Sequence, residues 1–312
     1  MVDFGSRIGI TAVAVHSEIR KPKSEMEQQV GRARPAKTQQ REDSMQNKKW
    51  LYGLVLVCAV VFSFSGAVFA GGLTYEGSST IGENILPEAV KAFEAKSGVK
   101  FNTIGSLGSG KGFKAVMAGT ADIAGVSRSL TPEEKKLKPY SQTIGYDAIA
   151  VFVNAKNPVK NLTKEQIKGI FTGKIKNWKE VGGKDAKIFV VTELLTGDRA
   201  TIKAFRELAL DDAAIYTDKE IDKPHDCAKA VADDVNAITH ASLAFAEPGI
   251  KAVSVGSVEP TNDNVRSGAY LLSRPLLLVT RELPSGDMKS FFSFILSPEG
   301  QAFVKKNFVP VK

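Results

Sequence analysis

Three short stretches combine glycine with small hydroxyl side chains where a strand is expected to run into a helix. They are Gly77-Ser78-Ser79-Thr80, Gly108-Ser109-Gly110-Lys111-Gly112 and Thr196-Gly197-Asp198-Arg199. Backbone N–H groups are free at the start of a helix, and glycine lets the backbone approach a ligand closely. A Ser or Thr in one isolated loop of this kind is usually a plain helix N-cap, but such loops also bind anions. Three of them, together with Ser127-Arg128 at the end of another expected strand, favour an anion-binding site.

The middle stretch also fits the first seven positions of the nucleotide-binding P-loop, GxxxxGK, over Gly105–Lys111. The eighth position of that motif is a Ser or Thr that holds magnesium, whereas this chain has Gly112. No clear apolar strand ending in a magnesium-holding Asp follows it. We therefore do not expect nucleotide hydrolysis.

Side chains that could carry out catalysis are sparse after residue 70. This part of the chain has two histidines, His225 and His240, and no G-x-S-x-G motif, so a Ser-His-Asp hydrolase lacks its usual parts. The run His225-Asp226-Cys227 has no second spaced pair and does not indicate a zinc site. Binding of single-stranded nucleic acid requires basic residues interleaved with aromatic residues, and the lysines of this chain lack that pattern. We expect no catalytic residue, metal, cofactor or nucleic-acid partner.

The first seventy residues have a different character from the rest. Residues 1–44 show no sustained apolar periodicity, which predicts a disordered or non-native extension. Residues 45–70 begin with a short positive segment, continue with an apolar run and end in small residues at Ala70. This is the layout of a secretory signal peptide, with Met45 as the expected start and cleavage expected after Ala70. A single membrane anchor is the alternative, because about 20 apolar residues span a bilayer.

The charge of the chain is concentrated in this leader. The 312 residues include 42 Lys and Arg and 34 Asp and Glu, for a formal net charge of +8. Residues 1–70 hold 10 of the basic and 6 of the acidic residues, which leaves 32 against 28, or +4, for the exported chain. A composition of 43% apolar and 24% charged residues indicates a globular protein. Cys227 is the only cysteine after the leader, so the exported chain has no internal disulfide.

From Leu73 onward, short β-rich runs alternate with segments of helical periodicity, which predicts an α/β fold. A helix is expected from about Gly82 to Lys96. Capping boxes at Thr131–Glu134 and Thr163–Gln166 each predict a helix start. A long apolar strand is expected from Tyr146 to Asn154.

Several longer strings together resemble one known family. They are GSST, GSGKGFKAVMAGTADIAGVSR, IGYDAIAVFVN, LTKEQIKGIFTGKIKNWKEVGG and LSPEGQAFVKKNFVPV. They are similar to the phosphate-binding proteins of the phosphate ABC transporter, the PstS-like branch of the type II periplasmic binding proteins. The resemblance runs from about Leu73 to the C-terminus and is most specific from Ser109 to Trp178.

The resemblance implies a two-lobed α/β fold of the periplasmic binding protein (Venus flytrap) type. Two crossover segments would join the lobes, which close over a ligand in the cleft between them. The first lobe would comprise residues 73–147 plus 250–312, and the second lobe residues 148–249.

The ligand-binding residues implied by the resemblance lie in the hydroxyl-and-glycine loops and at one strand end. They are Ser79, Thr80, Ser109, Ser127, Arg128, Thr196, Gly197, Asp198 and Arg199. Ser127 stands where some members have an acidic acceptor, and Arg128 matches the arginine of the members with an ASRPL sequence.

The chain departs from the family pattern at two positions. An arginine usually precedes the third loop by four residues, where this chain has Thr192, and the threonine of that loop is Asp198. Micromolar binding requires about 8 kcal/mol, to which each charge-assisted bond contributes about 1.5–3 kcal/mol, so a lost arginine is a large deficit. Arg199 could replace it or point into solvent. Asp198 could accept the proton of monohydrogen phosphate, which fully ionised sulfate lacks, or lie outside the pocket.

The function expected from these observations is that of a monomeric, periplasmic solute-binding protein that captures inorganic phosphate. It would deliver the phosphate to an ABC permease in the inner membrane. One alternative is a protein that binds another oxyanion, or a divergent member that no longer binds phosphate. The other is an enzyme of phosphate ester chemistry, against which the absence of a metal cluster and of a nucleophile-base pair counts.

Overall fold

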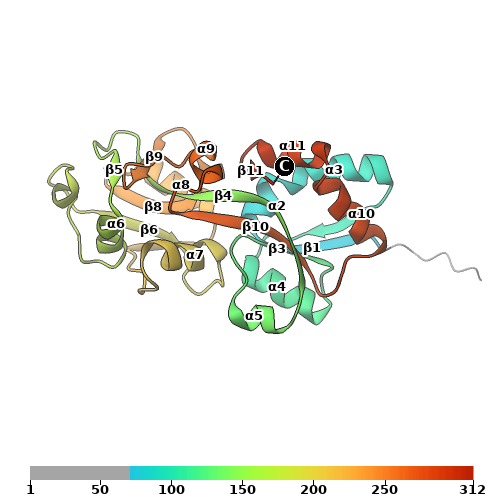
Figure 1. Cartoon of the computed structure of the whole chain (residues 1–312). Coiled ribbons are helices and arrows are strands. Elements are labelled where there is room, and N and C mark those ends of the chain that lie inside the picture. The colour runs from blue at the N-terminus through green and yellow to red at the C-terminus, as the bar shows by residue number, and fades with distance from the viewer. Residues whose placement is uncertain (1–70, 312) are drawn as a thin grey trace, which may run out of the picture. The chain divides into compact units, whose positions relative to one another are not determined.

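The computed structural model describes residues 71–311. The extension expected over residues 1–44 and the signal peptide expected over residues 45–70 lie outside the described residues. Helices alternate with strands along the chain, as the sequence predicts for an α/β fold (Figure 1). Within residues 71–311, no helix has both the length and the apolar character needed to cross a membrane.

The strands of the described chain form a mixed sheet. They are β1 (Leu73–Gly77), β2 (Phe101–Ile104), β3 (Ile123–Val126), β4 (Tyr140–Asn154), β5 (Asn161–Leu162), β6 (Phe189–Glu193), β7 (Lys219–Ile221), β8 (Ala237–Ser242), β9 (Ile250–Val255), β10 (Ser273–Thr280) and β11 (Val309–Pro310). The main path of the sheet has the order β2-β1-β3-β10-β4-β8-β6-β7. Off this path, β11 and β9 pair with β4, and β5 pairs with β9.

Helices pack against strands along this path. They are α2 (Ser79–Asn84), α3 (Leu86–Ser97), α4 (Ser109–Ala118), α5 (Pro132–Lys136), α6 (Lys164–Phe171), α7 (Ala200–Ala209), α8 (Pro224–Asp233), α9 (Asn262–Arg266), α10 (Gly286–Ile295) and α11 (Pro298–Lys305), with two 3₁₀ turns at Trp178–Val181 and Leu243–Phe245.

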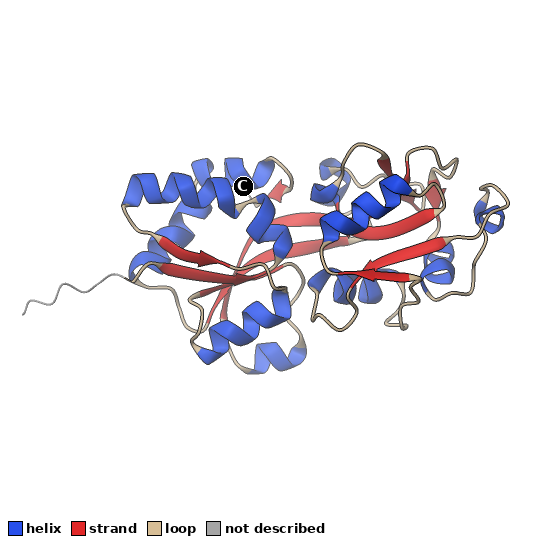
Figure 2. Ribbon diagram, turned by 180° about the vertical axis from the view of Figure 1, so that it is seen from behind, coloured by secondary structure: helices blue, strands red, loops and turns tan. Residues whose placement is uncertain are grey.

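Two main hydrophobic cores divide the described chain into two lobes. Phe93 of α3 and Phe291 of α10 pack in the first core, together with residues of β1, β3 and α11. Phe171 of α6, Phe205 of α7 and Ile238 of β8 pack in the second core. Figure 2 shows helices around the strands in each lobe. The two-lobed α/β fold implied by the resemblance is confirmed.

Strands β4 and β10 run from one lobe to the other. Residues 140–148 of β4 pair antiparallel with β10, whereas residues 149–154 pair with β8 and β9. Strand β10 starts at Ser273, opposite Ala148. The chain therefore passes between the lobes near residue 148 and again near residue 273.

The segment 250–272 packs with the second lobe. Val253 and Val255 of β9, Val265 of α9 and Leu272 belong to the second hydrophobic core. The sequence-based division assigns this segment to the first lobe. We propose instead that the first lobe comprises residues 73–147 plus 273–311, because the segment 250–272 buries its apolar side chains among those of residues 148–249.

Local signals in the sequence are confirmed at two helix starts and fail at a third. The capping boxes of Thr131 with Glu134 and of Thr163 with Gln166 are both formed. The single helix expected over residues 82–96 is wrong, because α2 and α3 are separate helices. Ser78 caps α2 by accepting a hydrogen bond from Ile81 N at 3.3 Å, and Pro87 lacks the N–H needed to continue that helix into α3.

Replacing Thr163 with alanine tests how much a predicted cap stabilises the second lobe. The Thr163 hydroxyl accepts a hydrogen bond from Gln166 N at 3.2 Å, and α6 buries Ile167 and Phe171 in the core. We expect Thr163→Ala to lower the free energy of unfolding by about 1 kcal/mol, as cap removal does elsewhere. Urea denaturation measures this. Thr163→Ser keeps the hydroxyl and is the control; equal stability of the two variants would contradict the prediction.

Candidate functional site

The starts of α2, α4 and α7 meet around one small cavity. Its lining consists of helix-start residues and two strand ends, namely Ser78, Ser79, Thr80, Gly108, Ser109, Ser127, Glu193, Arg199, Ala200 and Thr201. The first six belong to the first lobe and the other four to the second lobe. The hydroxyl-and-glycine stretches singled out from the sequence therefore face each other across the two lobes.

Hydrogen bonds between serines fix the first-lobe side of the cavity. The Ser78 hydroxyl donates to Ser127 Oγ at 2.9 Å, and Ser127 N donates to Ser109 Oγ at 3.1 Å. Gly77 has a φ of +140°, and a Cβ on it would lie 2.4 Å from Gly125 O, so only glycine allows the strand ends to approach this closely. The serines at the ends of β1 and β3 are thereby held beside the start of α4.

A buried arginine connects both lobes behind this cavity. Arg274 of β10 contacts Asp147 of β4 with Nε at 2.9 Å and Nη2 at 2.8 Å, and both side chains are 1% exposed. Its Nη1 donates to Thr201 Oγ1 at 3.0 Å and its Nη2 to Thr80 Oγ1 at 3.1 Å. Ser242 donates to the other Asp147 oxygen at 2.7 Å. Burial raises the pKa of Asp147, and Arg274 and the Ser242 hydroxyl oppose this rise.

Arg199 borders the cavity from the start of α7. Its side chain is 10% exposed, and its Nη2 donates to Asp222 Oδ1 at 2.5 Å and to Asp222 O at 3.0 Å. Among the described residues, its buried Nε has no hydrogen-bond partner. The guanidinium is therefore anchored at one end, while its other end retains a donor beside the cavity.

Glu193 brings a carboxyl group into the same lining. It ends β6, is 3% exposed, and its Oε2 has no hydrogen-bond partner among the described residues. Burial raises the pKa of Glu193 to about 7, although the charges of Arg199 and Arg274 oppose this shift. Near neutral pH this carboxyl therefore exists in both its protonated and its ionised form.

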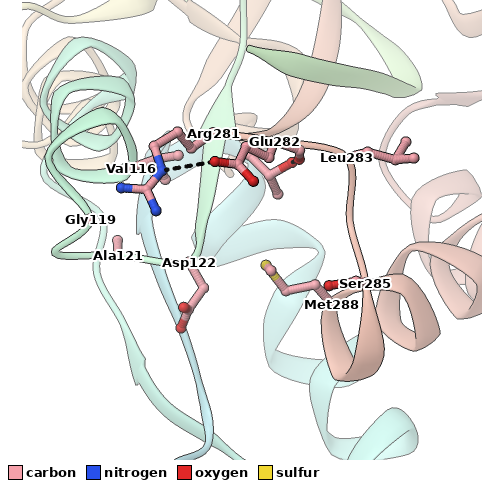
Figure 3. Close-up of a pocket in the computed structure, with 10 residues that line it drawn as sticks. Val116, Gly119, Ala121, Asp122, Arg281, Glu282, Leu283, Ser285 and Met288 are labelled. Atoms are coloured by element: carbon pink, nitrogen blue, oxygen red, sulfur yellow. Dashed lines mark hydrogen bonds and ion pairs between the residues drawn. The ribbon is translucent and has the colours of Figure 1, made fainter.

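A second hollow, shown in Figure 3, lies at the end of α4 and beside the segment between β10 and α10. Its charged groups have neighbouring partners: Asp122 accepts hydrogen bonds from Thr74 N and Oγ1 at 2.8 and 2.7 Å, and Arg281 Nε lies 3.9 Å from Glu282. None of the site residues expected from the sequence lines it. The cavity at the three helix starts is the better candidate.

Comparisons with known proteins show the family of this chain. A sequence profile of the PBP superfamily domain matches residues 66–299. The phosphate-binding protein PstS of Staphylococcus epidermidis is 31% identical over 286 residues, which is 82% of this chain and 87% of that protein. This chain belongs to the PBP superfamily and to its PstS family.

Two solved structures resemble this PstS-family chain over their whole length. A phosphate ABC transporter substrate-binding protein from Clostridium perfringens, solved with bound phosphate, is 36% identical with a TM-score of 0.72 and covers 78% of this chain and 100% of its own. An ABC-type phosphate transport receptor from Vibrio cholerae is 28% identical with a TM-score of 0.66 and covers 77% of this chain and 100% of its own.

Four of the expected site residues of this PstS-family chain lie outside the cavity lining. Arg128 forms a two-bonded ion pair with Glu134 at 2.7 and 2.8 Å. Thr196, Gly197 and Asp198 form the loop just before Arg199, and Gly110 N of α4 donates to Asp198 O at 3.3 Å. This loop of the second lobe therefore contacts a helix start of the first lobe next to the cavity.

The Asp198 carboxylate faces lysines. It lies 2.6 Å from Lys114 of α4 and 2.7 Å from Lys203 of α7, and hydrogen bonds from these two lysines lower its pKa to about 2. That this carboxylate selects phosphate stays a prediction. Each of its two oxygens already forms an ion pair with a lysine. Thr192, the other departure from the family pattern, is fully buried and does not line the cavity.

Four residues at or beside the cavity were not predicted from the sequence, namely Asp147, Glu193, Thr201 and Arg274. One signal was available: Asp147 and Arg274 are charged residues inside the apolar runs IGYDAIAVFVN and YLLSRPLLLV. A charge in a strand buried on both faces needs a partner, so the two could have been matched to each other.

Removing the Arg274 charge should destabilise this PstS-family protein strongly. Arg274→Met leaves Asp147 buried without its cation, which typically costs about 3–5 kcal/mol. Arg266→Met is the matched control, because its ion pair with Asp263 is largely exposed and worth at most about 1 kcal/mol. Urea denaturation measures the free energy of unfolding of both variants. Similar decreases would show that the buried ion pair stabilises the protein no more than the exposed one.

Glu193→Gln should change how stability depends on pH. A carboxyl whose pKa is raised on folding stabilises the folded state while protonated, and this contribution is lost as pH rises from about 4.5 through about 7. At about 1.36 kcal/mol per unit, the loss reaches about 3 kcal/mol. As pH rises, the unfolding free energy of Glu193→Gln, measured without ligand, should therefore increase relative to that of the parent protein. Parallel pH profiles would contradict the prediction.

Proposed function

We propose that this protein binds inorganic phosphate in the cavity between its two lobes and delivers it to an ABC permease in the inner membrane. The observation that carries the proposal is the convergence of six hydroxyl side chains and Arg199 on one cavity at three helix starts. The PstS family of the chain and the bound phosphate in its relative from Clostridium perfringens support the choice of ligand.

Within this proposal, the ligand is held by hydroxyls, backbone N–H groups and one guanidinium. Ser79, Thr80, Ser109 and Ser127 contribute from the first lobe, and Arg199 and Thr201 from the second. Helices α4 and α7 each have ten residues and present the positive end of their dipole to the cavity. The Nε donor of Arg199 supplies the charge-assisted bond that an arginine at position 192 would otherwise make.

Delivery requires that the lobes separate and that the contacts between them break. The contacts beside the cavity are the Lys114–Asp198 ion pair and the hydrogen bond from Gly110 N to Asp198 O. The ion pair is substantially exposed, and exposed pairs contribute at most about 1 kcal/mol. Water replaces such contacts readily, so the lobes can open at moderate cost.

We propose that the protein works as a monomer outside the cytoplasm, exported by the signal peptide over residues 45–70.

We further propose that the protein is a receptor without enzymatic activity. The relatives that it matches are named as binding proteins and transport receptors. Its two histidines among residues 71–311 are unsuited to acid-base work at the cavity. His240 lies in the second core, where burial lowers its pKa to about 3, and His225 lies against Glu247, away from the lining.

Phosphate binding and its dependence on Arg199 can be measured by calorimetry on the protein without residues 1–70. We expect phosphate to bind with a dissociation constant well below about 1 mM. Arg199→Met should weaken binding about 10- to 150-fold, the equivalent of one charge-assisted bond of about 1.5–3 kcal/mol. Arg206→Met, on the same helix but bonded to Asp212 O and Ala213 O outside the cavity, should bind as the parent does.

Two results would contradict this proposal. The absence of measurable phosphate binding would exclude phosphate as the ligand, and another oxyanion would then have to be sought. Equal weakening by Arg199→Met and Arg206→Met would show that only the overall charge matters.

A further inference from the structure

The loop between β2 and α4 carries the P-loop-like sequence, but only its end reaches the proposed phosphate cavity. Gly108 and Ser109 line the cavity, whereas residues 105–107 do not. In a nucleotide-binding P-loop, backbone N–H groups of this segment bind a phosphate. In this chain Leu107 N donates instead to Oε1 of Glu76, a residue of β1, at 2.9 Å. The middle of the loop therefore binds a carboxylate of the protein itself.

The Glu76 carboxyl fits closely against this loop. The same Oε1 accepts a hydrogen bond from Gly77 N at 2.8 Å, so one oxygen joins the end of β1 to the loop. A Cβ on Gly105 would lie 2.0 Å from Glu76 Oε2 and 2.7 Å from its Cδ. The φ of Gly105 is outside the left-handed region. Space for the carboxyl, and not backbone conformation, therefore requires a glycine at this position.

Backbone hydrogen bonds hold the two ends of the loop, and Glu76 holds its middle. Gly105 N donates to Tyr75 O, and Gly108 N donates to another carbonyl of β1, at 2.8 Å each. Between them, Leu107 N has no acceptor other than Glu76 among residues 71–311. The Leu107 side chain is 56% exposed, so packing restrains it little. The position of residue 107 therefore depends on one carboxylate.

We propose, building on the phosphate-binding function above, that Glu76 is a positioning residue for the bound oxyanion. Its carboxylate fixes the loop before the ligand arrives, so Gly108 and Ser109 already stand where the ligand needs them. Glu76 does not line the cavity, and it acts through the loop without touching the ligand. A loop that is ordered in advance raises affinity, because binding then loses no free energy to ordering it.

Glu76→Ala should weaken phosphate binding, measured by calorimetry on the protein without residues 1–70. Ordering the backbone of one residue on binding corresponds to about 5- to 30-fold in affinity, and we expect a loss of this size. Removing a negative charge beside an anion site would by itself strengthen binding. The direction of the change therefore separates positioning from charge, and an unchanged or higher affinity would overturn the proposal.

Glu76→Gln should recover most of the lost affinity. Its amide oxygen can still accept hydrogen bonds from Leu107 N and Gly77 N, although the side chain is uncharged. An affinity as low as that of Glu76→Ala would show that the acceptor oxygen is not what matters, and would contradict the proposal.

Asp122→Ala is the matched control for loss of stability in the first lobe. The Asp122 carboxylate also accepts two hydrogen bonds from β1, from Thr74 N and Oγ1, but it lies at the hollow of Figure 3. This variant should be less stable to urea and yet bind phosphate as the parent does. If it weakens binding as much as Glu76→Ala, general loosening of the lobe is responsible and the proposal is wrong.

Gly105→Ala tests the same contact while leaving Glu76 in place. The added methyl group occupies the space of the carboxyl, so it should weaken phosphate binding by a similar factor. Combined with Glu76→Ala, which vacates that space, it should cause no further loss, because changes that act through one contact are not additive. Additive losses would overturn the assignment. This variant also tests the proposal if Glu76→Ala does not fold.

Hydrogen exchange of the Leu107 amide examines the loop independently of affinity. In the parent this amide should be protected before phosphate is added, whereas in Glu76→Ala it should become protected only with phosphate. Equal exchange in the two ligand-free proteins would contradict the proposal. A parent protein that binds no phosphate would refute the proposed function itself. Phosphate binding that does not respond to Glu76→Ala would refute only the role of Glu76.

Discussion

The buried contact between Arg274 and Asp147 is the constraint on which the arrangement of this protein depends. The two residues lie directly opposite each other on β10 and β4, the two strands that run between the lobes. Charges this deeply buried are tolerated only when they are paired and hydrogen-bonded, and this pair meets both conditions with Ser242, Thr80 and Thr201 as further partners. The register of the two strands and the position of the guanidinium are therefore fixed together.

The same guanidinium links the framework to the cavity. Thr80 is at the start of α2 in the first lobe, and Thr201 is at the start of α7 in the second, so one side chain bonds to a helix start from each lobe. The residues at the rim are joined more loosely, by the contacts of Asp198 with Lys114 and Gly110. The buried contacts at the base are hard to exchange with water, whereas those at the rim exchange easily. Opening should therefore occur as a hinge motion about the base of the cavity.

Patterns within short segments were readable from the sequence, and contacts between distant segments were not. The capping boxes at Thr131 and Thr163 depend on residues three apart and were predicted correctly. The serine stretches around Ser78 and Ser109 pointed to a common site because each carries its own anion-binding signal. By contrast, Arg274 and Asp147 are 127 residues apart, and only the sheet register brings them together. The positions of Arg128 and Asp198 depend on Glu134, Lys114 and Lys203, which the motif itself does not reveal.

The charges near the cavity explain why the net charge of the chain says little about binding. Arg199 is offset by Asp222 and Arg274 by Asp147, so the paired charges cancel. The remaining attraction for an anion comes from N–H groups, hydroxyls and the free Arg199 donor. Against this neutral background the state of Glu193 decides the sign of the local charge, because its ionised form makes the cavity negative. A bound anion raises the pKa of Glu193 further by repulsion between like charges.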